Sequence, residues 1–300
     1  MTIQALIEKY QGKSCKSIRR IGGGYYADVY RVTYGNGESI VVKVYKVRGI
    51  MENEKCSDEL LSEYALAAVP EVLWVHKADG EFSKDVMAMS FLEGTIGGAV
   101  YYLSNAKRKR LADSVAENLL AFHRVHSSDG FGELDSDIRY ETFNEYYRKK
   151  AESVLTMADA LERKGELTSF VTDTLKSAYA QFDCIFRLPI TDARLVHGDY
   201  NMWNILVDRK SCSVSAVIDP CGCMWADSEY DLYQLNNANG KRLGIFEAYA
   251  AKRELSENCL EKMAFYELFN SVEHYYTSGH RVRKRKMDKR TKQLRKFLEV

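Results

Sequence analysis

The sequence predicts an α+β fold in which a strand-rich N-terminal third is followed by a mostly helical remainder. Two observations support this prediction. Residues 39–47 are rich in β-branched side chains and follow an Asn-Gly pair that is typical of a hairpin turn. From residue 104 to 186, apolar side chains instead recur at helical spacing. With 300 residues, 46% of them hydrophobic, the chain is long enough for one large domain or two lobes.

The composition argues against a membrane or secreted protein. No apolar run approaches the ~20 residues that a membrane helix needs, and residues 1–16 lack the layout of a signal peptide. The seven cysteines are an odd and scattered set, which indicates reduced thiols and a cytoplasmic protein. Cys221 and Cys223 form a C-x-C pair, but no second pair lies at zinc-finger spacing. We therefore interpret them as small apolar side chains beside a site rather than as metal ligands.

The net charge of +1 is unevenly distributed along the chain. Residues 281–300 hold ten Lys or Arg and two Asp or Glu, whereas the rest of the chain is acidic. An acidic body favours cationic substrates at its clefts. The basic tail fits either a patch for nucleic acid or an acidic partner, or a solvated terminal helix docked through Leu294, Phe297 and Leu298. We favour the docked helix and expect no nucleic-acid partner.

The N-terminal part begins with a short amphipathic helix at residues 2–11 and continues with strands over residues 17–47. Gly22, Gly23 and Gly24 fall in this strand region. Without side chains, their backbone could approach a phosphate closely. The alternative is a plain flexible turn.

Lys43 lies alone among apolar neighbours in the segment IVVKVY. An inward-facing lysine is costly unless an anion pairs with it. Strand alternation could equally put it on a solvent face, with Val42 and Val44 inward. Kinases place the lysine that binds the α- and β-phosphates one strand pair after a glycine loop, so we expect Lys43 to contact a nucleotide.

A helix over residues 52–68 should supply a glutamate that holds this lysine. Glu54, Glu59 and Glu63 all qualify, and we choose Glu59. Strands follow at residues 71–76 and 85–91, and the second one ends at Leu92-Glu93-Gly94. This strand-then-glycine step is either a hinge at which an adenine bonds to backbone groups, or an ordinary strand end.

The helical region contains a helix over residues 111–126 and two long helices within residues 141–186. His123 and His126 could suggest a metal pair. An H-x-x-H spacing alone is a weak signal, and we interpret it as a helix end with satisfied histidines.

The segment Leu195–Asp208 (LVHGDYNMWNILVD) and the following Val217–Pro220 carry the chemistry. Asp199, Asn204 and Asp219 are polar residues among apolar strands, and the Asp-to-Asn spacing matches the protein-kinase catalytic loop. Asp199 would receive the proton of a substrate hydroxyl. Asn204 and Asp219 would offer the oxygen ligands that Mg²⁺ prefers.

Two neighbours of this segment are expected to support it. We expect His197 to anchor the loop by hydrogen bonds rather than to act as a base. Residues 227–238 are predicted to form a helix with an acidic first turn. Within it, Asp231 would hold the catalytic loop by hydrogen bonds, which is a structural role.

The motifs HGDYNMWN and IDPCGCMWADSEYDL resemble those of the aminoglycoside phosphotransferase family, the small-molecule relatives of protein kinases that include choline kinase-like enzymes. The resemblance covers the chain from Ile21 to about Tyr276. Asp219-Pro220 and the segment SEYDL are more similar to the fructosamine (ketosamine) kinase branch. The run Tyr200–Trp203 departs from the family pattern and would be the place where substrate choice is set.

The resemblance implies a protein-kinase-like fold with two lobes. Residues 1–93 would form a small antiparallel N-lobe with one helix, and residues 94–300 a mostly helical C-lobe. ATP would lie between them, under the glycines and on Lys43, with adenine at the backbone of Ser90 and Leu92. The acceptor would lie against C-lobe helices, near Asp199 and the stretch from Asp227 to Asp231.

These observations favour an ATP- and Mg²⁺-dependent phosphotransferase that acts on a hydroxyl of a small, cationic molecule of the aminoglycoside or amino-sugar type. The first alternative is a fructosamine kinase acting on glycated amines. A protein kinase is less favoured, because the chain has neither an A-P-E segment nor a D-F-G triplet. A non-catalytic nucleotide-binding module is disfavoured by the intact polar residues. The sequence leaves the oligomeric state open.

Overall fold

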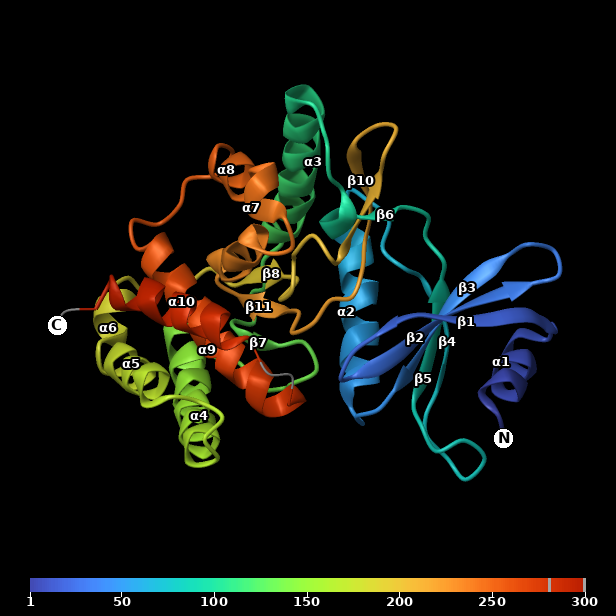
Figure 1. Ribbon diagram of the computed structural model, residues 1–300, viewed down its shortest axis with the longest axis horizontal. Coiled ribbons are helices and arrows are strands. Elements are labelled where there is room, and N and C mark those ends of the chain that lie inside the picture. Colours follow the sequence, from blue (N-terminus) through green and yellow to red (C-terminus); the bar gives the residue numbers. More distant parts are fainter. Residues whose placement is uncertain (280–281, 299–300) are drawn as a thin grey trace.

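A computed structural model describes residues 1–279 and 282–298 (Figure 1). Its N-terminal part is built on an antiparallel sheet with the strand order β1-β2-β3-β5-β4. These strands are β1 (Cys15–Gly23), β2 (Ala27–Tyr34), β3 (Ser39–Tyr45), β4 (Val72–His76) and β5 (Val86–Ser90). The predicted strand-rich N-terminal part is therefore confirmed.

The turn between β2 and β3 differs from the expected two-residue type, which needs a positive φ at both central residues. Among the described residues of this turn, Gly37 alone has a positive φ, at 87°. The Gly37 N–H donates to the Tyr34 carbonyl (3.1 Å), and the Tyr34 N–H donates to the Glu38 carbonyl (2.9 Å). This pattern is the longer hairpin loop in which one glycine occupies the left-handed position.

Two helices cover the opposite faces of this sheet: α1 (Ile3–Gln11) and α2 (Ile50–Tyr64). Val42 and Val44 of β3 pack in the cluster that contains Leu6 and Ile7 of α1. Tyr45 packs instead in a cluster with Met51 of α2. Because side chains alternate along a strand, β3 has no solvent face, and its odd-numbered residues face α2. Figure 1 shows α2 between the sheet and the rest of the molecule.

After β5 the chain crosses into the C-terminal part through β6 (Thr95–Ile96), which pairs with β9 (Ile205–Asp208). β9 also pairs with β10 (Ser213–Val217). The backbone just after α2 joins the same region, since Ala68 exchanges hydrogen bonds with Ser215 (3.2 Å) and Val217 (2.9 Å). Both the hinge segment and the end of α2 are thus fixed to the C-terminal part. The exact division at residues 93 and 94 remains a prediction.

The C-terminal part is mostly helical, as predicted. Its helices are α3 (Asn105–His123), α4 (Phe143–Arg163), α5 (Ser169–Ala180), α6 (Phe182–Ile185), α7 (Gly240–Leu243), α8 (Ile245–Ala250), α9 (Cys259–Ser278) and α10 (Lys284–Arg295). A small sheet pairs β11 (Met224–Ala226) with β7 (Gly132–Glu133) and with β8 (Arg194–Val196). Two 3₁₀ segments complete it: η1 (Gly97–Ala99) and η2 (Ser228–Asn236). The predicted helix after residue 227 is thus of the tighter 3₁₀ type.

The basic tail forms the predicted docked helix, α10. Leu294, Met287 and Thr291 are buried, and Phe297 and Leu298 pack against the same core. Arg290 is bound to the Glu267 carboxylate of α9 at 2.8 Å. Residues 281, 299 and 300 of the basic segment lie outside the described residues.

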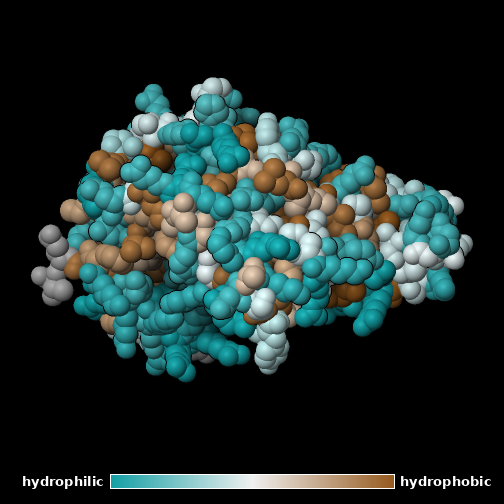
Figure 2. All heavy atoms as spheres, turned by 90° about the horizontal axis from the view of Figure 1, so that it is seen from above, coloured by the Kyte–Doolittle hydropathy of each residue, from teal (hydrophilic) through white to brown (hydrophobic). Residues whose placement is uncertain are grey.

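Seen from above, the molecule has a largely hydrophilic surface in which hydrophobic side chains form separate small groups (Figure 2). None of the helices in the described part of the chain is long and apolar enough to span a membrane. All seven cysteines are free thiols.

Candidate functional site

Lys43 lies at the junction of the sheet, α2 and the loop that follows β10. Its ammonium donates to Glu54 of α2 and to Asp219 Oδ1, the latter at 2.6 Å. The Tyr45 hydroxyl also donates to Glu54 (2.7 Å). Burial lowers the pKa of Lys43, but the carboxylates of Glu54 and Asp219 outweigh this effect and raise it. Lys43 is therefore a buried, fully charged cation held between two carboxylates.

The choice of Glu59 as the partner of Lys43 is wrong. Glu59 is exposed and pairs with Lys55 on the surface of α2. The buried face of α2 carries Met51, Glu54, Ser57, Asp58 and Leu61. Glu54 lies at helical spacing from Met51 and Leu61, so it belongs to the stripe that faces β3.

Asp199 accepts hydrogen bonds from three side-chain amides. Asn201 and Gln234 both donate to its Oδ1 (2.7 Å each), and Asn204 donates to its Oδ2 (2.8 Å). A carboxylate has about four acceptor positions, so one position is left for a hydroxyl. Desolvation raises the pKa of Asp199 to about 7, the Asn204 amide opposes the rise, and the negative charge of Asp219 adds to it. The group is thus oriented and has a pKa suited to accepting a proton near neutral pH.

The loop that carries Asp199 is held by Asp231, which confirms the predicted structural role. The fully buried carboxylate of Asp231 accepts the backbone N–H groups of His197 and Gly198, both at 2.8 Å, and also contacts His123 Nε2 (3.2 Å). His123 binds the Tyr249 hydroxyl through its other ring nitrogen (2.8 Å). It is therefore a satisfied core histidine, as expected.

His197 is buried, and its Nδ1 lies 3.3 Å from the Asp199 N–H, which donates to it. Desolvation lowers the pKa of His197 although Asp231 opposes this shift. A neutral imidazole that accepts a backbone bond fits the predicted anchoring role.

Asn204 and Asp219 lie close together, as a pair of magnesium ligands would require. The Ile218 N–H donates to the Asn204 carbonyl (2.9 Å), and the Asn204 side-chain nitrogen lies 3.5 Å from the Asp219 carbonyl. The Asn204 side-chain nitrogen donates to Asp199. The Asn204 side-chain oxygen accepts no hydrogen bond from residues 1–279 and 282–298. Asp219 has a left-handed φ of 59°, and Lys43 lowers its pKa. An ionised carboxylate beside a free amide oxygen is a donor set that fits Mg²⁺.

The glycine run forms a tight hairpin rather than an open loop. Gly22 and Gly23 belong to β1, and the Gly24 N–H donates to the Ala27 carbonyl (2.9 Å). Gly23 has a φ of 136°, and a Cβ there would lie 2.9 Å from that carbonyl. The Lys46 ammonium binds the Gly24 carbonyl (2.8 Å), which puts a cation at the tip of this hairpin.

At the hinge, one of the backbone groups expected to bind adenine already has a partner within the protein. The Ser90 N–H donates to the Glu71 carbonyl (2.9 Å), so a nucleotide contact at Ser90 would have to use its carbonyl group. Leu92 lies just beyond β5 and is half-buried. Adenine contacts at these two residues remain a prediction.

The run from Tyr200 to Trp203 divides between the core and the surface. Tyr200 is fully buried and its hydroxyl donates to the Val115 carbonyl (2.9 Å), while Met202 is 2% exposed. Asn201 binds Asp199, and Trp203 is 57% exposed and covers Gly98. Tyr200 and Met202 thus belong to the core, and Trp203 alone of the four is open to solvent.

Asp227 and Glu229, which lie in the stretch expected near the acceptor, have their partners inside the protein. Asp227 accepts from Lys262 (2.7 Å) and Tyr266 (2.9 Å), and Glu229 binds Lys262 (2.8 Å) and Ser256 (2.6 Å). All of these carboxylates are buried and paired inside the protein. They are not available to a cationic substrate.

Sequence reasoning missed Gln234 and Asn201, which orient Asp199. Both are uncharged residues in segments that we interpreted for other reasons. Their contribution depends on the folding of η2 against the catalytic loop, and no spacing pattern in the sequence marks that contact.

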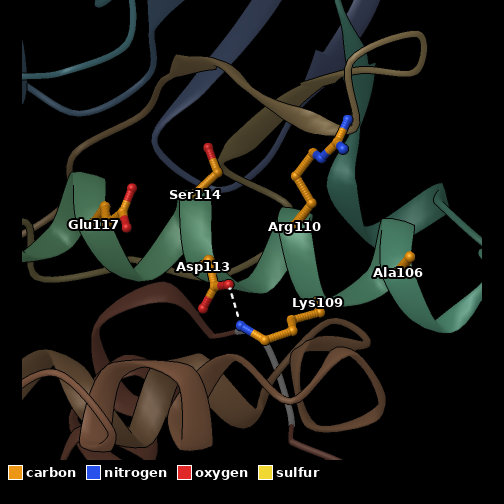
Figure 3. Close-up of a pocket in the computed structure, with 6 residues that line it drawn as sticks. All are labelled: Ala106, Lys109, Arg110, Asp113, Ser114 and Glu117. Atoms are coloured by element: carbon orange, nitrogen blue, oxygen red, sulfur yellow. Dashed lines mark hydrogen bonds and ion pairs between the residues drawn. The ribbon is translucent and has the colours of Figure 1, made fainter.

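An open hollow along α3 is separate from this cluster (Figure 3). Lys109 and Asp113 form an ion pair on it (2.7 Å), and Arg110 reaches the Ser211 carbonyl (3.4 Å). It contains none of the candidate site residues.

The chain is similar to known phosphotransferases in both sequence and fold. Residues 17–266 match the Phosphotransferase enzyme family (APH). The uncharacterized protein YcbJ of Escherichia coli (strain K12) is 21% identical over 264 residues, which cover 88% of this chain and 87% of that protein. A candidate fructosamine-3-kinase from Thermobifida fusca YX-ER1 has a TM-score of 0.74 at 18% identity and covers 98% of this chain and 99% of its own.

A second solved structure is a thermostable mutant of the aminoglycoside phosphotransferase APH(4)-Ia in a ternary complex with ADP and hygromycin B. Its TM-score is 0.73 at 15% identity, and the alignment covers 99% of this chain and 98% of that one. The expected kinase-like fold is thereby confirmed.

The fold, the site and these matches define the class: the protein is a phosphotransferase with a protein-kinase-like fold. The chain belongs to the Phosphotransferase enzyme family, which confirms the resemblance found in its motifs.

Proposed function

We propose that this phosphotransferase moves the γ-phosphate of ATP to a hydroxyl of a small amine-bearing molecule of the aminoglycoside or other amino-sugar type. The observation that supports it most is the convergence of Lys43, Asp199, Asn204 and Asp219 from distant parts of the chain. Kinases use a lysine, a catalytic Asp and two metal-binding oxygens in this relationship.

In the proposed reaction Asp199 accepts the proton of the acceptor hydroxyl while that oxygen bonds to the γ-phosphorus. The bond between this phosphorus and the β–γ bridging oxygen breaks, and ADP leaves. Lys43 would bind the α- and β-phosphates, and Glu54 would hold its ammonium in place. The glycine hairpin at Gly22–Gly24 would cover the phosphates with its backbone.

Asn204 and Asp219 would hold Mg²⁺ through their side-chain oxygens. The ion would neutralise the phosphate charge during transfer. Asp219 would therefore serve both Lys43 and Mg²⁺, and Lys43 keeps its carboxylate ionised by lowering its pKa.

A kinase for glycated amines is the alternative within this class. Asp219-Pro220 and the structural similarity to the candidate fructosamine-3-kinase favour it. A location in the cytoplasm, with ATP and Mg²⁺ at hand, completes the proposal.

The test is transfer from γ-labelled ATP, with Mg²⁺, to a panel of hydroxylated amines that includes aminoglycosides and ketosamines. Asp199→Ala should abolish transfer while ATP binding, measured by calorimetry, persists. Retained turnover in that variant would overturn the assignment of Asp199. ATP binding without transfer to any acceptor or to water would indicate a non-catalytic nucleotide-binding module.

A further inference from the structure

Trp203 presents one face of its indole ring to solvent from within the catalytic loop. Its side chain is 57% exposed, although Met202 before it and Asn204 after it are buried. A Cβ added at Gly98 would lie 2.8–3.0 Å from three adjacent atoms of the six-membered ring, Cε3, Cδ2 and Cζ3. The backbone of Gly98 therefore lies under one face of the ring, and the opposite face is the open one.

The segments that meet beneath the indole fix it in place. The Gly98 N–H donates to the Met202 carbonyl (2.7 Å), and the Trp203 N–H donates to Asn201 Oδ1 (2.9 Å). Because residue 98 has no side chain, the ring can lie against the backbone of η1. A group that is held in place before binding loses little conformational entropy when a ligand packs on it. Trp203 is thus a preformed aromatic surface.

The same loop brings this surface next to the proposed base. Asn201, which accepts the Trp203 N–H, donates to Asp199 Oδ1 (2.7 Å). Asn204, the residue after Trp203, donates to Asp199 Oδ2 (2.8 Å). Consecutive Cα atoms are about 3.8 Å apart, so Trp203 adjoins a residue that touches the base. A molecule whose hydroxyl meets Asp199 is therefore within reach of the indole.

A turn rich in amide side chains, residues 234–239 (QLNNAN), also borders Asp199. Gln234 donates to Asp199 Oδ1 (2.7 Å) and accepts from the Asn237 side chain (2.6 Å). Asn237 is half-buried, and its side-chain oxygen accepts no hydrogen bond from residues 1–279 and 282–298. This turn therefore offers a free amide oxygen that one side chain separates from the base.

The backbone of this turn is strained, and its end is bound to the segment beneath the indole. Ala238 and Asn239 have left-handed φ values of 49° and 79°. Such conformations are uncommon outside glycine and concentrate at active sites and ligand-binding sites. The Asn239 side chain donates to the Val100 carbonyl (3.0 Å), two residues after Gly98. The amide-rich turn and the support of the indole are thus fixed to each other.

The indole face and the amides together match the chemistry of a sugar ring. A pyranose has a face of C–H groups that can pack on the electron-rich face of an indole, and hydroxyls at its edge that can bond to planar amides. An open-chain polyol has the hydroxyls without the rigid face. Residues 234–239 carry no charged side chain, so these contacts favour the ring rather than an amine attached to it.

We propose that Trp203 determines acceptor specificity by stacking a pyranose-type sugar ring on its open indole face, with the hydroxyl-bearing edge of the ring toward Asn237. This inference rests on the proposed phosphotransfer, because the stacked ring would direct one of its hydroxyls to Asp199. It narrows the acceptor to molecules that carry such a ring, and it makes the amine a secondary feature of recognition.

The test uses four probes that vary the ring and the amine independently, on the full chain with ADP. Methyl glucopyranoside and methyl 2-amino-2-deoxyglucopyranoside have the ring, without and with an amine. Glucitol and 1-amino-1-deoxyglucitol are their open-chain counterparts. Affinities are measured by ligand-observed NMR. Each ring probe should bind about tenfold more tightly than the open-chain probe of the same charge, and the amine should have the smaller effect.

Variants of Trp203 should change this preference selectively. Trp203→Ala should abolish the preference for the ring, whereas Trp203→Phe, which keeps an aromatic face, should retain part of it. In turnover assays Trp203→Ala should raise KM for a ring acceptor and leave KM for ATP unchanged. Asn237→Ala should weaken both ring probes. Tyr64→Ala is the matched control, because Tyr64 is an aromatic residue at the end of α2 that is 39% exposed, and it should change none of these values.

Fluorescence gives an independent readout of contact with the indole. The chain has three tryptophans, and Trp203 is the one classed with the exposed side chains. The ring probes should change the emission of the unaltered protein but not that of Trp203→Phe. Equal affinities for ring and open-chain probes, an unchanged preference in Trp203→Ala, or weaker ATP binding in that variant would overturn the proposal. A preference set by the amine alone would also overturn it, since it would indicate an ammonium over the indole.

The proposed function can fail independently. If the ring probes bind through Trp203 but no acceptor receives phosphate, the sugar-ring site stands and the proposed function falls. If open-chain and ring acceptors are phosphorylated equally well and Trp203→Ala changes neither, the proposed function stands and this inference falls.

Discussion

The proposed chemistry depends on the carboxylate of Asp199. Desolvation raises its pKa to about 7, against the amide of Asn204. A base must be deprotonated to accept a proton, so activity should be low below this pKa and should rise with pH through it. We predict that kcat/KM increases about tenfold per pH unit on the acid side and levels off above about pH 7. A pH profile that stays flat across this range would contradict the role of Asp199.

The pairing of Lys43 with Glu54 leads to a second prediction. Glu54→Gln removes a buried charge that Lys43 and Tyr45 both contact. Breaking a buried ion pair costs about 3–5 kcal/mol, so denaturant unfolding should show a loss of this order together with a strong loss of turnover. Glu59→Gln is the matched control on the same helix. It should change stability by less than about 0.5 kcal/mol, as exposed substitutions usually do.

The contrast between Glu54 and Glu59 shows why Glu54 could not be chosen from the sequence. Glu54, Glu59 and Glu63 have the same chemistry, and the choice among them depends on which stripe of α2 faces β3. Apolar side chains do not mark that stripe by themselves, because Cys56 and Tyr64 of the same helix are exposed. In contrast, Asp199, Asn204 and Asp219 could be found because three polar residues interrupt strands that are otherwise apolar.

At the scale of elements, the catalytic loop depends on a backbone position that only glycine adopts readily. Gly198 has a φ of 81°, and a Cβ there would collide with the carbonyl oxygens of Cys221 and Gly222. We predict that Gly198→Ala destabilises the protein by about 1–3 kcal/mol and strongly reduces turnover, because it displaces both sides of the site. Gly35→Ala is the control, since nothing lies within 4 Å of the added carbon. Equal melting temperatures for the two variants would disagree with this account.

The terminal helix α10 gives a prediction about packing. Leu294 is fully buried, and α10 packs against α5 and α9. Leu294→Ala should cost about 2–5 kcal/mol, measured by denaturant unfolding, whereas Lys292→Ala on the exposed side should be nearly neutral. If Leu294→Ala left the free energy of unfolding unchanged, α10 would not be part of the folded core.

Helix periodicity in the sequence located α3, α4 and α5, whose buried residues recur at helical spacing. Short elements were harder to predict. The 3₁₀ geometry of η2 and the tight hairpin at Gly22–Gly24 depend on tertiary contacts such as those of Asp231 and Ala27. For the same reason Gln234, which lies in η2, could not be recognised as a partner of Asp199.

At the scale of the whole molecule, the hydrogen bond between Lys43 and Asp219 connects the N-terminal sheet to the C-terminal part. Nucleotide and metal should therefore stabilise the whole fold. We predict that ATP raises the melting temperature more with Mg²⁺ than without, by an amount that corresponds to about 2.7 kcal/mol at a hundredfold excess over Kd. In Asp219→Ala the additional shift caused by Mg²⁺ should disappear, while a shift from metal-free ATP should remain. A full Mg²⁺ effect in that variant would rule out Asp219 as a ligand.

The charge distribution of the whole molecule is a poor guide to its substrate. Its acidic body suggested a cationic ligand, yet the carboxylates of Asp227, Glu229 and Asp231 all bind partners inside the protein. The net charge includes buried and exposed residues alike, whereas substrate recognition depends on the few charged side chains that remain unpaired at the site.

The most direct test of the central claim is the rate of Mg²⁺-dependent transfer of the γ-phosphate in Asp199→Asn against the unaltered protein. This substitution keeps the shape of the side chain and removes its ability to take a proton. We predict a rate lower by about 10²–10⁴-fold with unchanged affinity for ATP. A rate within a few-fold of the unaltered protein would show that Asp199 is not the base and that this cluster is not the phosphoryl-transfer centre.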